Sequence, residues 1–243
     1  MPTTTPFVWE VTIALIAGLL AFDYFFHVRK AHAPGLREAA VWSALYVGIA
    51  LLFGVAVWTW GGADMGAEYF SGYITEKALS IDNVFVISLI FTYFAIPAKY
   101  QYRALLWGII AVIVLRGLMI AGGAALVNEA YWVLYLFAAF LIFTGVKMFF
   151  AGDQPMDVAN NPAVKFISRH MRVTPQLHGQ HFFVKTPDAK TGKLVTAATP
   201  LFLALVVINL ADLVFAVDSV PAIFAITTDT FIVYTSNIMA ILG

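Results

Sequence analysis

Six apolar stretches, each at least 20 residues long, constrain the fold of this chain more than any other feature. They cover residues 7–26, 40–60, 71–96, 104–127, 131–150 and 200–226. A helix needs about 20 mainly apolar residues to cross about 30 Å of hydrocarbon, so each stretch is long enough to span a bilayer. A seventh stretch, 231–243, holds only 13 residues and is too short to cross alone. It either enters the membrane part-way or is truncated after Gly243, and we favour truncation.

The overall composition also requires a membrane. Apolar residues make up 61% of the 243 residues, charged residues only 12%, and the mean hydropathy is +0.86. Soluble domains are roughly 45–50% apolar and about 25% charged. The 14 Lys and Arg balance 14 Asp and Glu, so nothing points to nucleic acid as a partner. There is no cysteine, which excludes disulfides, thiolate metal sites and a cysteine nucleophile. We expect an all-α, polytopic bundle of about seven spans that interacts with the lipid bilayer.

Basic residues in the loops predict the orientation. Loops 27–39, 97–103 and 151–199 carry 11 of the 14 Lys and Arg, whereas the alternate loops 61–70, 128–130 and 227–230 carry none. The positive-inside rule then places the N-terminus outside and the basic loops in the cytoplasm, with the chain in the inner (plasma) membrane.

The loops also divide the chain into three parts. Residues 1–150 are expected to form the first five helices, 151–199 a cytoplasmic loop, and 200–243 the sixth helix and an incomplete seventh. Within the loop, two short runs at 181–185 and 193–196 flank a turn at 186–192 and predict a small hairpin.

An acidic motif occurs twice, at 76–84 in the third span and at 212–220 in the sixth. Each copy reads acid, five residues, aspartate, a residue with an amide or hydroxyl side chain, and valine. The two copies lie three spans apart, so they cross the membrane in opposite directions. This pattern is typical of an inverted-topology repeat, which many transporters use to build a site near the bilayer midplane.

The spacing within each motif bears on helix continuity. Six residues separate the two acids, which puts them about 120° apart on an unbroken helix, so they would not share a face. Gly72 precedes the first motif, and Pro221 follows the second and frees a backbone carbonyl. We therefore predict that the third and sixth helices are broken at midplane, which lets their carboxylates, Asn83 and Ser219 face one another.

Buried acids at this depth favour a cation site, because each costs several kcal/mol unless it is paired or hydrated. The four acids, with Lys77 and Arg116 in the same slab, sum to −2, which one divalent cation would neutralise. Carboxylate, amide and hydroxyl oxygens suit Mn, Mg or Ca. The predicted metal ligands are Glu76, Asp82, Asn83, Asp212 and Asp218.

Other polar groups in the spans are candidates for counter-ions, additional ligands or interhelical hydrogen bonds. These are Ser80, Lys77, Arg116, Asn209, Ser219, Asn237 and Asp23. Arg116 is expected to be a counter-ion to the acids. A purely structural ion pair, Glu76–Lys77 or Asp82–Arg116, is the alternative to a substrate site.

Several segments of the chain resemble the TerC family of membrane proteins, in particular its Alx-like manganese exporters. They are Phe22-Asp23 with His27–His32, Tyr73–Phe85, Leu115–Gly117, Thr199–Leu203, Asp212–Ala222 and Thr235–Ile238. The resemblance implies export of manganese from the cytoplasm, within the LysE-type transporter superfamily, with the five predicted ligands handling the metal. Proteins of this kind usually continue for further helices beyond the position of Gly243.

The leading functional hypothesis is therefore a secondary transporter that exports Mn²⁺ as its substrate, coupled to protons or to the membrane potential. Calcium or magnesium is the alternative cargo, and the oligomeric state stays open. An intramembrane aspartyl protease also needs two embedded aspartates, but the chain has no Gly-x-Gly-Asp sequence and two further acids would be unexplained. A scaffold that recruits partners through 151–199 is a third hypothesis. We expect no enzymatic activity and no catalytic cofactor.

Overall fold

The structure is a computed structural model that describes residues 5–29, 32–151, 162–187 and 194–243. Eight α-helices follow one another along these residues. They are α1 (Pro6–Asp23), α2 (Leu36–Gly61), α3 (Ala63–Tyr93), α4 (Ala98–Glu129), α5 (Val133–Ala151), α6 (Pro162–His170), α7 (Pro200–Phe224) and α8 (Thr230–Leu242). A five-residue π-helical turn, η1 (Tyr24–Val28), continues α1. Each of the seven predicted apolar stretches coincides with a helix.

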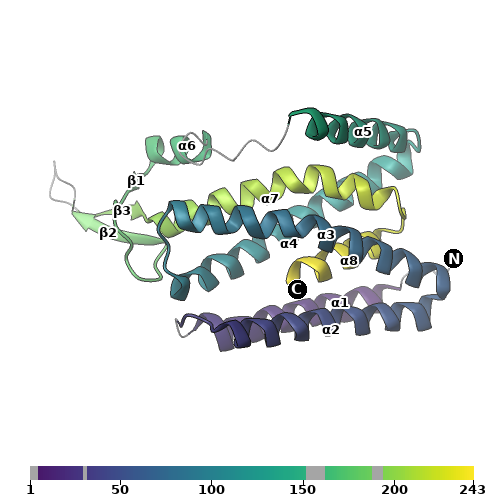
Figure 1. The fold of residues 1–243 in the computed structure, drawn as a ribbon, viewed down its shortest axis with the longest axis horizontal. Coiled ribbons are helices and arrows are strands. Elements are labelled where there is room, and N and C mark those ends of the chain that lie inside the picture. Colours follow the sequence, from purple (N-terminus) through teal and green to yellow (C-terminus); the bar gives the residue numbers. More distant parts are fainter. Residues whose placement is uncertain (1–4, 30–31, 152–161, 188–193) are drawn as a thin grey trace.

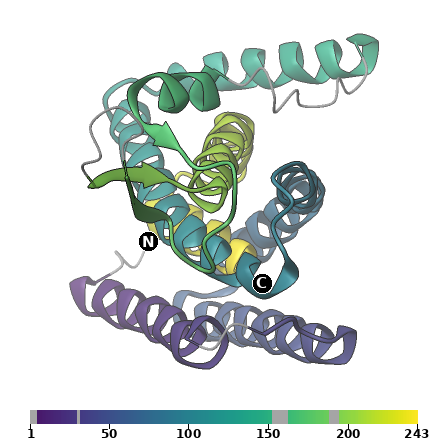
Figure 2. The ribbon, with the colours of Figure 1, turned by 90° about the vertical axis from the view of Figure 1, so that its left-hand side faces the viewer.

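Four helices form the centre of the bundle, with the remaining long helices on its flanks. Figures 1 and 2 show α3, α4, α7 and α8 in the middle, α1 and α2 together on one side, and α5 on the opposite side. The most extensive helix contacts join α3 to α8 and α4 to α7. Apolar clusters around Tyr69, Ile90 and Ile120 pack these helices together.

The helices have the length and composition of membrane spans. Within the described residues, four segments are long and apolar enough to cross a bilayer: Pro6–Phe26, Leu36–Gly61, Ala98–Glu129 and Pro200–Phe224. Shorter apolar helices occupy Val133–Lys147 and Thr230–Leu242. Large apolar side chains are exposed along them, including Leu52, Leu118 and Ile142. The chain is thus a polytopic helical membrane protein.

The prediction of broken helices is wrong, since α3 and α7 each run without interruption through the acidic motif. Gly72 does not break α3 but permits close approach of α8, because a Cβ at this position would lie 2.7 Å from Oγ of Ser236. Pro221 lies in the last turn of α7, which ends at Phe224. A proline so near the C-terminal end removes one hydrogen bond without dividing the helix.

Between α6 and α7 the described residues form a small three-stranded sheet, so the all-α fold class is corrected by a sheet larger than the expected hairpin. Strand β2 (Phe183–Pro187) pairs antiparallel with β3 (Leu194–Ala198), with Phe183 opposite Ala198. This confirms the predicted hairpin, although most of its turn, residues 188–193, lies outside the described residues. Strand β1 (Arg172–Val173) pairs parallel with the other edge of β3. Helix α6 and β1 were not predicted.

Candidate functional site

Arg116 is the centre of a buried polar cluster in the middle of the bundle. It lies on α4 and is only 1% exposed. Its Nε and Nη2 donate to the two carboxylate oxygens of Asp212 at 3.0 and 2.8 Å. Its Nη1 donates to Glu76 Oε1, to Ser219 Oγ at 3.2 Å and to Asn237 Oδ1 at 3.0 Å. One guanidinium therefore joins side chains from α3, α7 and α8.

Glu76 is buried as deeply as Arg116, with 1% of its surface exposed. Its second carboxylate oxygen, Oε2, accepts a hydrogen bond from Nδ2 of Asn237 at 3.0 Å. Both oxygens of this carboxylate are thus hydrogen-bonded inside the bundle. Charges in such a place persist only when they are paired and hydrogen-bonded in this way. The predicted counter-ion role of Arg116 agrees with this geometry, and its acidic partners are Glu76 and Asp212 rather than Asp82.

Two buried amide oxygens, one on α3 and one on α7, have no hydrogen-bond donor among the described residues. Asn83 Nδ2 lies 3.5 Å from Asp212 Oδ1, while its Oδ1 is buried and has no partner among the described residues. Asn209 Nδ2 donates to the carbonyl of Leu205 at 2.8 Å, and its Oδ1 is likewise buried and unpartnered in the described part of the chain. Buried acceptors normally receive a hydrogen bond, so these two oxygens are free to accept one from a ligand or to coordinate a cation.

The second acid of each motif lies away from the cluster. Asp82 is exposed on α3, and Asp218 is half-buried on α7, where its carboxylate is under the electrostatic influence of Lys147 from α5. The prediction that all four carboxylates face one another is therefore wrong, and only Glu76 and Asp212 meet. The reason is helix continuity, because six residues on an unbroken helix turn the second acid about 120° away.

The cluster does not by itself assemble a ready-made ligand set. Among the residues that the structure describes, no three Asp, Glu or His side chains come together in a way that could hold a metal ion. The metal-ligand role of Glu76, Asp82, Asn83, Asp212 and Asp218 stays a prediction.

The remaining predicted polar residues divide between this centre and its surroundings. Ser219 and Asn237 belong to the cluster, and Ser80 Oγ donates to the backbone carbonyl of Glu76 at 2.7 Å.

Lys77 Nζ donates to the carbonyl of Ala240 on α8 at 3.2 Å, which rules out a Glu76–Lys77 pair as the main contact. Asp23 lies apart, in a 290 Å³ cavity shared with Tyr46 and Tyr102.

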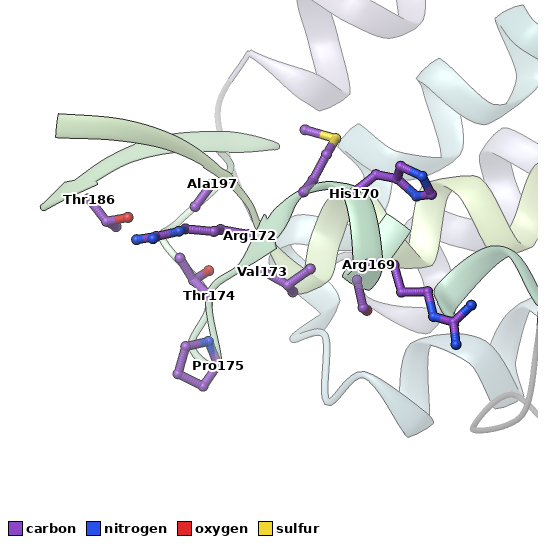
Figure 3. Close-up of a pocket in the computed structure, with 10 residues that line it drawn as sticks. Arg169, His170, Arg172, Val173, Thr174, Pro175, Thr186 and Ala197 are labelled. Atoms are coloured by element: carbon purple, nitrogen blue, oxygen red, sulfur yellow. The ribbon is translucent and has the colours of Figure 1, made fainter. Parts of the chain in front are cut away.

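Cavities lie near both ends of the bundle. The larger, about 1020 Å³, is lined by Asp64, Glu68 and Asp229 together with aromatic side chains such as Tyr131 and Phe224. Thr227 Oγ1 donates to Glu68 Oε2 there at 2.6 Å. At the opposite end, a 640 Å³ hollow runs along α6, β1 and the hairpin (Figure 3). Figure 3 shows the side chains of Arg169 and Arg172 pointing in different directions, so they form no common site.

The bundle and its centre define a class of protein: a polytopic membrane protein with acidic and basic side chains buried inside its helix bundle. Residues 61–243 match the model of the integral membrane protein TerC family, and the chain belongs to that family.

Its relatives include membrane proteins that are longer than this chain and are similar to it over nearly all of its length. An uncharacterized membrane protein of Rickettsia felis is 46% identical over 235 residues, which cover 97% of this chain and 76% of the relative. A protein of Escherichia coli K12 named putative membrane-bound redox modulator Alx is 44% identical over 248 aligned positions, which cover 98% of this chain and 75% of the relative. No solved structure matches the chain.

Proposed function

We propose that this TerC family protein is a secondary transporter that exports a hard divalent cation, manganese in the first place, through the buried centre around Arg116. The observation that carries the proposal is the meeting of Glu76 and Asp212 at Arg116, on two helices with related motifs. Beside them lies a buried amide oxygen of Asn83 that has no partner in the described part of the chain. A purely structural ion pair would not explain that oxygen.

The charges of the centre suit exchange with a dication. Two carboxylates and one guanidinium sum to −1, so the cluster retains an excess of negative charge in a region that disfavours it. When Arg116 moves off the carboxylates, a charge of −2 is left for the cargo. The available donors are carboxylate and amide oxygens, which suit Mn²⁺, Mg²⁺ or Ca²⁺. In this mechanism Arg116 occupies the site when the substrate is absent.

The packing supports an inverted repeat of α2–α3–α4 and α5–α7–α8. In this repeat α2, α3 and α4 correspond to α5, α7 and α8. The contact between α3 and α8 then corresponds to the contact between α7 and α4, and the contact between α2 and α3 corresponds to the contact between α5 and α7. The helices α3 and α7 also run in opposite directions (Figure 1). A site between such halves can be opened to one side of the membrane at a time.

The outer acids extend the site toward both membrane surfaces. Asp82 and Asp218 each lie six residues beyond the central acid of their helix, which is about 9 Å along the axis. Since α3 and α7 are antiparallel, the two acids lie on opposite sides of the centre. We assign them the role of attracting the cation on its way in and out. The acidic cavity with Asp64 and Glu68 forms the outer mouth.

Export requires an energy source under this scheme. With the basic loops in the cytoplasm, moving two positive charges outward against 100 mV costs about 4.6 kcal/mol. Protons that enter as the cation leaves, bound by the same carboxylates, provide the coupling.

The centre suits transport better than the competing chemistries. An aspartyl protease needs two aspartates that share a proton, whereas here Arg116 lies between a glutamate and an aspartate. The name of the E. coli relative concerns redox, yet this chain has no cysteine and hence no thiol–disulfide chemistry of its own.

Transport into inside-out vesicles that contain a manganese-sensitive dye tests the proposal. We expect uptake by the unmodified protein, loss of uptake in Asp212→Asn, and reduced uptake in Asp82→Asn and Asp218→Asn. Glu129→Gln, an exposed acid at the end of α4, is the matched control and should transport normally. Competition by Ca²⁺ and Mg²⁺ then ranks the cargoes. Unchanged uptake in Asp212→Asn would remove the centre from the mechanism.

A further inference from the structure

A second candidate site, separate from the transport centre, lies where α4 begins. A cavity of about 410 Å³ separates the first turns of α4 from the turn at 178–181 that leads into β2. Its lining residues are Lys99, Tyr100, Arg103, Gly179, Gln180 and His181. None of these is acidic and three can carry positive charge, so the cavity is suited to an anion.

The unusual member of this cavity is Arg103. Its guanidinium carbon lies 5.6 Å from the ring centre of Phe182, and this cation–π contact holds the side chain in place. Its Nε is buried and has no hydrogen-bond partner among the described residues, and no described carboxylate pairs with Arg103. A buried charged donor without an acceptor is costly. The Nε itself is closed off from the cavity, but no described carboxylate balances the charge of the guanidinium, and an anion in the cavity would balance it.

Two neighbouring features add to the positive potential at the same place. Lys99 lies one turn before Arg103 and therefore on the same face of α4. Helix α4 starts at Ala98 after Pro97, and no side chain caps its N-terminus. The N–H groups of an uncapped first turn carry a partial positive charge that attracts anions.

We propose that this cavity binds a phosphate group. The planar guanidinium of Arg103 provides paired donors that match phosphate oxygens, and Lys99 adds a point charge. Helix α4 is long and apolar enough to span the bilayer, so its N-terminal end lies at the level of the lipid phosphates. The same chemistry would accept the headgroup of an anionic phospholipid or free inorganic phosphate.

The proposed ligand would also join two parts of the chain. Phe182 and Tyr100 pack against the same apolar cluster, which contains Ile96 and Leu201, so the start of the hairpin already lies against the start of α4. A phosphate held between Arg103 and the 178–181 turn would strengthen that contact. The site is independent of which ion, if any, the centre transports.

Two measurements on the full chain in non-ionic detergent distinguish the sources. Native mass spectrometry counts the phosphatidylglycerol that is retained after extraction from mixed phosphatidylglycerol and phosphatidylcholine vesicles. Calorimetry measures binding of inorganic phosphate. The variants are Arg103→Gln and Lys99→Gln, and Arg169→Gln in α6 is the matched control. Lys99 is exposed, so its substitution leaves folding intact even if Arg103→Gln does not.

Each outcome decides the proposal. Retention of phosphatidylglycerol that falls in Lys99→Gln and Arg103→Gln but not in Arg169→Gln identifies a lipid headgroup. Phosphate binding that weakens about tenfold in the same two variants, as expected for loss of one charge-assisted hydrogen bond, without a change in retained lipid, identifies free phosphate. Equal behaviour of all four proteins in both measurements overturns the site.

Discussion

Helices α3 and α7 carry the same acidic motif, yet their surroundings differ. In α7, 12 of 25 residues are buried, and Ala216, Ser219 and Val220 of its motif are among them. In α3, 8 of 31 residues are buried, and none of them falls between Lys77 and Leu89. The second acid is accordingly exposed in α3, as Asp82, and half-buried in α7, as Asp218.

This difference shows that the motif determines which atoms are present and the neighbouring helices determine how they are used. The first acid of each copy reaches Arg116, because α4 packs along α7 and α8, which in turn packs along α3. Beyond it, α5 contributes Lys147 near Asp218, whereas the corresponding part of α3 has no fully buried residue. In the proposed transport cycle, the site is thus more open on the side of Asp82.

The largest effect on stability is expected from Arg116→Met. The substitution leaves Glu76 and Asp212 as buried carboxylates without a counter-ion, and breaking a buried ion pair in this way costs about 3–5 kcal/mol. The free energy of unfolding in detergent measures it, with Arg37→Met, an exposed arginine at the start of α2, as the matched control. Adding Glu76→Gln and Asp212→Asn to Arg116→Met should recover much of the loss, since no unpaired charge is then left. A single variant as stable as the control would contradict the central role of Arg116.

Much of the helical architecture could be predicted from sequence because the length of a bilayer span is a local signal. The seven apolar stretches and the hairpin required no knowledge of neighbouring helices. The predicted helix breaks were wrong because the effect of a glycine or a proline depends on its surroundings in the fold. Gly72 is explained only by the close approach of Ser236, which lies 164 residues further along the chain. Pro221 has little effect on α7 because it lies so close to the end of the helix.

The residues of the buried cluster could be singled out from the sequence, but not their arrangement. Arg116 is a lone charge in the middle of an apolar helix, which was enough to identify it as a counter-ion. Its contacts with Glu76, Asp212 and Asn237 depend on the rotation of four helices about their axes. Periodicity in one sequence does not determine those rotations. The anion cavity at Arg103 was missed because its two walls lie far apart in sequence.

The two helix crossings that correspond under the inverted repeat should respond differently to one added methyl group. In Gly72→Ala the new Cβ meets Oγ and Cβ of Ser236 on α8 at 2.7 and 3.1 Å. We expect a loss of about 1–3 kcal/mol, as for overpacking in general. In Gly123→Ala it meets the ring edge of Phe224 on α7 at 2.8 Å, and this ring can shift, so the loss should be smaller.

Gly122→Ala provides the control for both variants, because nothing lies within 4 Å of the added Cβ there. It should stabilise the protein by up to about 1 kcal/mol through helix propensity. Thermal or denaturant unfolding of the three variants ranks them. A loss in Gly72→Ala no greater than in Gly122→Ala would mean that α3 and α8 do not approach as closely as described.

Substitution of either central acid should abolish transport while leaving the free energy of unfolding nearly unchanged. Glu76→Gln and Asp212→Asn each remove one of two negative charges that share one guanidinium, so the remaining pair is neutral. We expect the free energy of unfolding to change by less than about 1 kcal/mol, while manganese uptake is lost in both. If either variant is as unstable as Arg116→Met, both carboxylates are needed for folding and the centre is a structural ion pair.

The smallest effect on stability is expected at the outer acids, because substitutions at the surface change it by about 0.5 kcal/mol or less. For Asp82 and Asp218 the measured quantity is therefore the accessibility of the side chain. The chain has no cysteine, so in Asp82→Cys and Asp218→Cys only the introduced thiol can react with a membrane-impermeant maleimide. In vesicles of known sidedness, Asp82→Cys should react from the side that carries the 151–199 loop. Asp218→Cys should react from the opposite side, and more slowly because Asp218 is half-buried.

Thr186→Cys in the hairpin and Glu129→Cys at the end of α4 mark the two sides. Reaction of both outer positions from one side would be incompatible with an inverted repeat, since antiparallel α3 and α7 must carry their second acids toward opposite surfaces.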